Sequence, residues 1–162
     1  MYHNNSRVRM FLLATLTVVF STAPIGAWPT CDEHVTGGGW LIGPSGDKVN
    51  FGINAFWDAS SQSYKGHINY VDQSAGIHVS TGAIFDYAVI SGNTRGFRYR
   101  ADGDGGYDEV RVFVTDNGEP GRDDVFQIQL LAGGNIIYTA LGSLGGDASG
   151  GGNVQIHHEN CH

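Results

Sequence analysis

The sequence predicts an all-β fold, which is either an antiparallel β-sandwich, jelly-roll-like, or a flattened barrel of about nine strands. β-Prone segments recur about every ten residues from Val35 onward, and Gly, Asp, Asn and Ser separate them. Apolar and polar residues alternate within these segments, as in half-buried strands. No segment shows the longer period of an amphipathic helix.

The expected strands cover the segments 35–42, 48–57, 64–71, 77–90, 95–101, 109–115, 124–132, 135–142 and 153–158. The longest segment contains Gly82, where a break or a bulge is expected. Along the segment 48–57, the apolar side chains of Val49, Phe51 and Ile53 share one face. That face is expected to be buried between two layers of strands.

Residues 1–27 are expected to form a cleavable secretory signal peptide. Arg7 and Arg9 precede an apolar run at 10–20, and small residues follow, which is the order of a secretory signal. The run is too short to cross a bilayer stably. The alternative is a buried N-terminal helix, which would show a polar face that this segment lacks. The mature chain, residues 28–162, is therefore expected to be one secreted β-domain without a transmembrane span, extracellular or alternatively periplasmic.

The charge of the chain argues against nucleic acid as a partner. The sequence carries nine basic and sixteen acidic residues, a formal net charge of −7. Removing residues 1–27 takes away two arginines and no acid, which leaves seven basic and sixteen acidic residues and a charge of −9. Phosphate backbones attract basic surfaces, so nucleic acid is not an expected partner. For a single domain of this size we expect a monomer or weak self-association.

The chain has only two cysteines, Cys31 and Cys161, near the two ends of the mature domain. Export favours their oxidation to a disulfide. Closing so long a loop would contribute about 4–5 kcal/mol in a chain-entropy account. Two alternatives stay open: two free thiols, or a zinc site suggested by the spacings Cys31-x-x-His34 and His158-x-x-Cys161.

Two acidic turns are candidate cation sites. The first carries carboxylates in a glycine-rich turn, at Asp102, Asp104, Asp108 and Glu109. Such oxygens suit structural calcium, the cofactor that we expect if these turns bind one, although the spacing is not that of an EF-hand. The second turn covers residues 116–124. For both, the alternative is an ordinary solvated hairpin turn, because turns favour Asp and Gly.

Three arginines are the first candidate ligand-binding residues. If Asp102 lies opposite Glu109 in a hairpin, Arg100 faces Arg111, and Arg98 lies on the same side. Like charges that face one another destabilise a sheet. The pattern therefore leaves three explanations: a different register, neutralisation by carboxylates, or an anionic ligand such as an acidic polysaccharide.

Two aromatic residues are the second candidate for ligand binding. Trp57 and Tyr64 flank a polar loop, and aromatic rings next to hydrogen-bonding groups suit a sugar. Packing in the core is the alternative for Trp57 and also for Trp40.

Four short segments resemble the post-COAP family of exported bacterial β-domains: VTGGGW at 35–40, NFGIN at 50–54, DNGEPG at 116–121 followed by Asp123 and Phe126, and GNVQIH at 152–157. The resemblance covers nearly the whole mature chain. It implies an extracellular, non-catalytic module. It implies no particular ligand and no catalytic residues.

No catalytic constellation is readable in the sequence, which contains neither G-x-S-x-G nor H-E-x-x-H. We therefore expect an exported or surface-associated binding module, for a polysaccharide or another cell-envelope component. Two alternatives remain. One is a small secreted polysaccharide hydrolase or lyase, and the other is a structural or matrix component that acts in adhesion.

Overall fold

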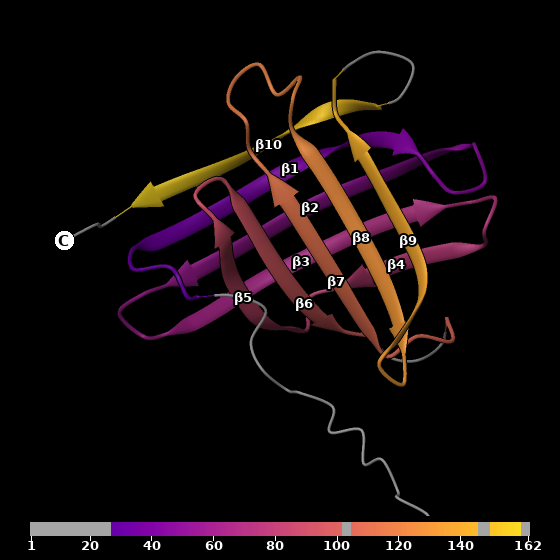
Figure 1. Ribbon diagram of the computed structural model, residues 1–162. Coiled ribbons are helices and arrows are strands. Elements are labelled where there is room, and N and C mark those ends of the chain that lie inside the picture. The colour runs from indigo at the N-terminus through magenta and orange to yellow at the C-terminus, as the bar shows by residue number, and fades with distance from the viewer. Residues whose placement is uncertain (1–26, 102–104, 146–149, 160–162) are drawn as a thin grey trace, which may run out of the picture.

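The computed structural model describes residues 27–101, 105–145 and 150–159, which form two antiparallel sheets of five strands each (Figure 1). The first sheet has the order β10-β1-β2-β3-β4, and the second has the order β5-β6-β7-β8-β9. The two sheets stack face to face, with their strands crossing at an angle (Figure 1). This arrangement confirms the predicted sandwich, and the sheets do not close into a barrel.

The strands are β1 (Asp32–Ile42), β2 (Lys48–Asp58), β3 (Ser63–Asp72), β4 (Ile77–Thr81), β5 (Ile84–Ser91), β6 (Thr94–Arg100), β7 (Glu109–Thr115), β8 (Val125–Ala132), β9 (Asn135–Ser143) and β10 (Gly150–Glu159). Their number is ten rather than nine because the expected break at Gly82 separates β4 from β5. At this break the chain leaves the first sheet and enters the second. Within each sheet consecutive strands pair as hairpins, and β10 returns to pair with β1.

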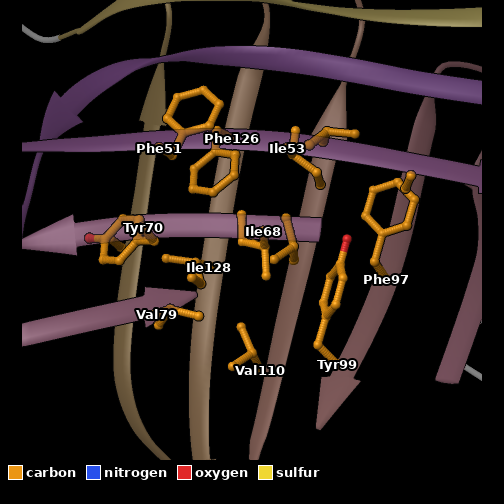
Figure 2. Packing of buried hydrophobic residues seen from close by; sticks show 14 of the residues in the cluster. Phe51, Ile53, Ile68, Tyr70, Val79, Phe97, Tyr99, Val110, Phe126 and Ile128 are labelled. Atoms are coloured by element: carbon orange, nitrogen blue, oxygen red, sulfur yellow. The ribbon is translucent and has the colours of Figure 1, made fainter. Parts of the chain in front are cut away.

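The core lies between the sheets and is built from large apolar side chains of both layers (Figure 2). Phe51 of β2 stacks on Phe126 of β8, with ring centroids 3.8 Å apart. Ile68 of β3 and Ile128 of β8 are fully or almost fully excluded from solvent. Each such side chain contributes about 1.5–3 kcal/mol to folding. The face of β2 that alternation predicts to be buried therefore is buried.

Two buried polar links join the sheets beside opposite ends of β2. In the first, Arg95 of β6 donates to both carboxylate oxygens of Glu33, at 2.5 and 2.6 Å, and Tyr87 donates to the same carboxylate at 2.6 Å. In the second, the Tyr138 hydroxyl donates to Asp72 Oδ2 at 2.7 Å and lies 2.6 Å from the Tyr70 hydroxyl. In both links the charged and polar groups are thus paired.

The side chains of the turn 116–124 cover the outer edge of β10. Asp124 Oδ2 accepts a hydrogen bond from the Val154 N–H at 2.9 Å, and Asp116 Oδ2 accepts one from the Ile156 N–H at 2.9 Å. The other Asp124 oxygen accepts from the Asn117 N–H at 2.8 Å. These bonds satisfy donors that an edge strand would otherwise expose. The second acidic turn therefore uses two of its carboxylates to hold β10 in place.

The pairing of β1 with β10 brings the two ends of the domain together, because Asp32 lies opposite Glu159. Cys31 precedes Asp32, and no cysteine among the described residues is a free thiol. Cys161 lies outside the described residues, so the disulfide between Cys31 and Cys161 stays a prediction. The predicted signal peptide also lies outside them, except for Ala27. Within the described ranges, no helix has the length and apolar character that a membrane crossing needs.

Candidate functional site

The three arginines predicted as ligand contacts lie in the second sheet, in a register that differs from the expected one. Arg98 lies opposite Arg111, and Arg100 lies opposite Glu109. The two strands are therefore shifted relative to the expected pairing, in which Arg100 faces Arg111. Glu109 accepts hydrogen bonds from Arg98 at 2.9 and 3.0 Å and from Arg111 at 2.6 Å. Burial raises the pKa of Glu109, but the bonds from both arginines outweigh it, and the net pKa is lowered. Asp86 Oδ2 lies 3.6 Å from Arg98 Nη1, so two carboxylates, Glu109 and Asp86, neutralise the two facing arginines.

The predicted aromatic pair is internal to the fold. Trp57 is only 2% exposed, and its Nε1 donates to the Pro29 carbonyl at 3.1 Å. The Tyr64 hydroxyl donates to the Phe85 carbonyl, and the Tyr64 ring stacks on Trp57 with centroids 6.0 Å apart. Trp57 therefore offers no open ring face on which a sugar can stack. The position of Trp57 fits the alternative, in which it packs in the core.

The predicted calcium turn is described only in part. Asp102 and Asp104 lie outside the described residues. Asp108 Oδ2 accepts a hydrogen bond from the Gly133 N–H at 3.0 Å, and Glu109 is bonded to arginines. Across the described ranges no group of three or more His, Cys, Asp or Glu side chains is placed to hold a metal ion. Structural calcium at this turn stays a prediction.

A different surface combines features that suit a ligand: the outer face of the first sheet, which points away from the second sheet. Alternation sends Phe51 and Ile53 of β2 into the core and leaves Asn50, Gly52 and Asn54 on the outer face. The register aligns these positions across the strands. We call one resulting line of residues the glycine row: Asn153, Gly38, Gly52, Asn69 and Ser80.

The centre of the glycine row has no side chains. Gly38 and Gly52 lie directly opposite one another on β1 and β2. A Cβ atom at Gly52 would meet no atom within 4 Å, and one at Gly38 would make only ordinary contacts, from 3.4 Å. Packing therefore does not require glycine at either position, although glycine weakens a strand interior. Such a glycine often marks a bulge, a tight bend, or a place where a ligand or another backbone approaches closely. The pairing of β1 with β2 shows no register shift, so a bulge does not explain these two glycines.

Hydrogen-bonding side chains border the glycine row on both sides. One neighbouring row holds Gln155, Thr36, Asn54 and His67, and the other holds Gly151, Trp40, Asn50, Val71 and His78. The amides both donate and accept hydrogen bonds, as sugar hydroxyls do. A flat strip between such groups is suited to a ring with hydroxyls along its edge.

Contacts within the outer face hold its margin at β10 and β1. The Glu119 carboxylate, from the turn 116–124, accepts hydrogen bonds from the side-chain amides of Asn153, at 3.1 Å, and Gln155. The Lys48 ammonium lies 4.1 Å from the centroid of the Trp40 ring, within cation–π range. Trp40 is half-buried on the outer face rather than in the core. The margin is therefore held in one arrangement before any ligand arrives.

Sequence reasoning missed this site although part of the signal is present. The alternation that predicts burial of Phe51 and Ile53 also predicts exposure of Gly52 between them. The alignment of Gly52 with Gly38 depends on the register between β1 and β2, which alternation alone does not give.

Comparison of the chain with models of known protein families, with curated proteins and with solved structures finds no match.

Proposed function

We propose that this chain is an exported, extracellular binding module that holds a polysaccharide against the outer face of the first sheet. The observation that carries the proposal is the pair of open glycines, Gly38 and Gly52, between two rows that include three amides, one hydroxyl, two imidazoles and the indole of Trp40. The order of the N-terminal residues supports export. The resemblance to the post-COAP family, itself a prediction, points to the same class of protein.

A single added side chain tests the site. Gly52→Val fills the glycine row without a clash, because no atom lies within 4 Å of the new Cβ, and valine favours strands. The variant is expected to fold with an unchanged or higher unfolding midpoint and to lose polysaccharide binding. Binding is measured by affinity gel electrophoresis of the mature protein through a panel of neutral and acidic soluble polysaccharides.

The matched control is Thr139→Val, which places the same side chain at an exposed position of β9 in the second sheet. This control is expected to bind as the wild type does. If Gly52→Val were retarded by the same polymers as the wild type, the glycine row would not be the binding site.

The hydrolase or lyase alternative makes a different prediction for the same samples. Glycoside hydrolysis generally uses two carboxyl groups on either side of the bond that breaks. The glycine row and its two neighbouring rows, as far as they are described, contain no Asp or Glu. Release of reducing ends or unsaturated products from a bound polymer would nevertheless favour the enzyme. The adhesion alternative stays a prediction.

A further inference from the structure

The basic side chains of the chain are divided between the two sheets. Both of its lysines, Lys48 and Lys65, lie on the outer face of the first sheet. Four of the five described histidines lie on the same face: His34, His67, His78 and His157. All the arginines that lie in described strands belong to the second sheet. A protein with a net charge of −7 therefore gathers its lysines and most of its described histidines around the glycine row.

The neighbours of each histidine are known from the register. His34 lies between His157, with ring centroids 6.4 Å apart, and Phe56. His67 lies beside Asn54, with its Nε2 3.5 Å from the Ser80 hydroxyl. His78 lies beside Val71, and His157 has only His34 as a cross-strand neighbour among the described strands. No carboxylate faces any of the four from a neighbouring strand position.

Acidic residues occur at the margins of this face. Asp32, Asp58 and Glu159 form the row beyond His34 and His157. Hydrogen bonds from Ser60 and Ser61 lower the pKa of Asp58 to about 2, so it stays ionised. Glu119 lies at the β10 margin, where it is bonded to Asn153 and Gln155. The acids therefore lie along the margins of the face, and Glu119 reaches the β10 end of the glycine row at Asn153.

We infer that the polysaccharide held on this face is anionic, with carboxylate or sulfate groups, and that its binding tightens as the pH falls from 7.5 to 5.5. The inference rests on the function proposed above. Lysine is charged across this range, whereas histidine gains its proton within it. The four carboxylates at the margins outnumber the two lysines, and each imidazolium that forms on the face adds one positive charge to it. The charged groups of a uronic acid or sulfated polymer remain ionised and meet this charge.

The test uses one polymer in two charge states. Polygalacturonate is anionic, and its fully methyl-esterified form has the same backbone without the charge. Binding of the mature protein to each polymer is measured at pH 7.5, 6.5 and 5.5, at constant ionic strength. The affinity for polygalacturonate is expected to rise by about tenfold over this range, because positive charge is added beside a polyanion. The affinity for the ester is expected to change little.

Two neighbouring histidines provide a matched pair of variants. His157 lies on the outer face, whereas the His158 Nδ1 lies 3.1 Å from Glu33 on the inner side of β10. The triple variant His34→Gln, His67→Gln and His157→Gln is expected to lose the rise in affinity at low pH, and His158→Gln is expected to keep it. If the triple variant does not fold, the single variant His67→Gln, at an exposed position, is expected to show a smaller rise in affinity at low pH than the wild type.

The outcomes separate this inference from the function on which it rests. Equal binding of both polymer forms at every pH would overturn the inference and leave the proposed function standing. Tighter binding of duplex DNA or of phosphatidylglycerol vesicles, with the same pH dependence, would overturn the assignment of the anion to a polysaccharide. Binding of polygalacturonate that survives in Gly52→Val would overturn both.

Discussion

Tyr87 and Tyr99 are both excluded from solvent, but their hydroxyls are satisfied differently. The Tyr87 hydroxyl donates to Glu33 at 2.6 Å. The Tyr99 hydroxyl is buried in the core and has no hydrogen-bond partner in the part of the chain that the structure describes (Figure 2). Burial raises the pKa of both phenols, so both stay protonated at ordinary pH. The hydroxyl of Tyr99 is therefore a desolvated group without a compensating bond.

Removing the two hydroxyls should have opposite effects on stability. Tyr99→Phe is expected to leave the free energy of unfolding unchanged or to raise it, because it removes an unpaired polar group. Tyr87→Phe is expected to lower it by about 1–3 kcal/mol, because it leaves a buried charged pair with one bond fewer. Urea unfolding of both variants, followed by tryptophan fluorescence, measures the difference. A larger loss in Tyr99→Phe than in Tyr87→Phe would show that the Tyr99 hydroxyl has a partner.

At the scale of elements, β10 depends on side chains from a distant turn. Its outer N–H groups at Val154 and Ile156 bond to Asp124 and Asp116 rather than to another strand. Asp124 is fully buried and bonds on both oxygens, so its carboxylate acts as the missing partner of an edge strand. β10 also supplies Asn153 and Gln155 to the outer face. The turn 116–124 therefore fixes one margin of the proposed site.

Asp124→Ala is expected to lower the free energy of unfolding by about 1–3 kcal/mol, because it leaves two backbone N–H groups unpaired. Hydrogen exchange should accelerate at Val154, whose N–H loses its acceptor. The neighbouring substitution Asp123→Ala, at an exposed position, is the control and should change stability by less than about 0.5 kcal/mol. Equal exchange rates at Val154 in both variants would contradict the role of Asp124.

The strands could be predicted from the sequence because their signals are local. Alternation and turn residues lie within each segment, so each of the ten strands overlaps an expected segment. The first and last strands are longer than expected, because β1 begins at Asp32 and β10 at Gly150. Pairing is not local, so the sequence predicts the strands β6 and β7 but leaves their register open, and the structure has the different register that was one of the three explanations. Alternation already favours the core for Trp57, because it lies on the same face of its strand as Val49, Phe51 and Ile53. Trp40 lies beside Leu41 in an apolar run, and only the packed sheets show that Leu41 points inward and Trp40 outward.

At the scale of the whole molecule, two polar links fix one sheet against the other. Glu33 and Arg95 form one link, and Asp72 and Tyr138 form the other. Burial raises the pKa of Asp72, but hydrogen bonds from the Ala75 N–H, Tyr138 and Ser74 outweigh it, and the net pKa lies below the ordinary value of 3.8. A carboxylate with a lowered pKa stabilises the fold above its unfolded pKa. This contribution disappears as the pH falls through the folded pKa.

The sandwich should therefore lose stability between pH 5 and pH 3, and Asp72 should account for part of the loss. Asp72→Asn is expected to be less stable than the wild type at pH 5, because an amide replaces the acceptor of Tyr138. Its urea midpoint should, however, fall less between pH 5 and pH 3 than that of the wild type, because the titrating group is gone. Parallel falls in both proteins would assign the acid sensitivity to other carboxylates, such as Glu109.

The adjacency of the two ends of the domain makes it suitable for insertion into another protein. Asp32 and Glu159 are cross-strand neighbours, so their backbones lie about 5 Å apart. A host protein could carry the domain in a surface loop without moving the two sides of that loop apart. Asp32 and Gly38 are six positions apart along β1, about 20 Å of strand, so the junction would leave the glycine row open. The same fold can therefore stand alone or be carried as a cassette in a surface loop of a host protein.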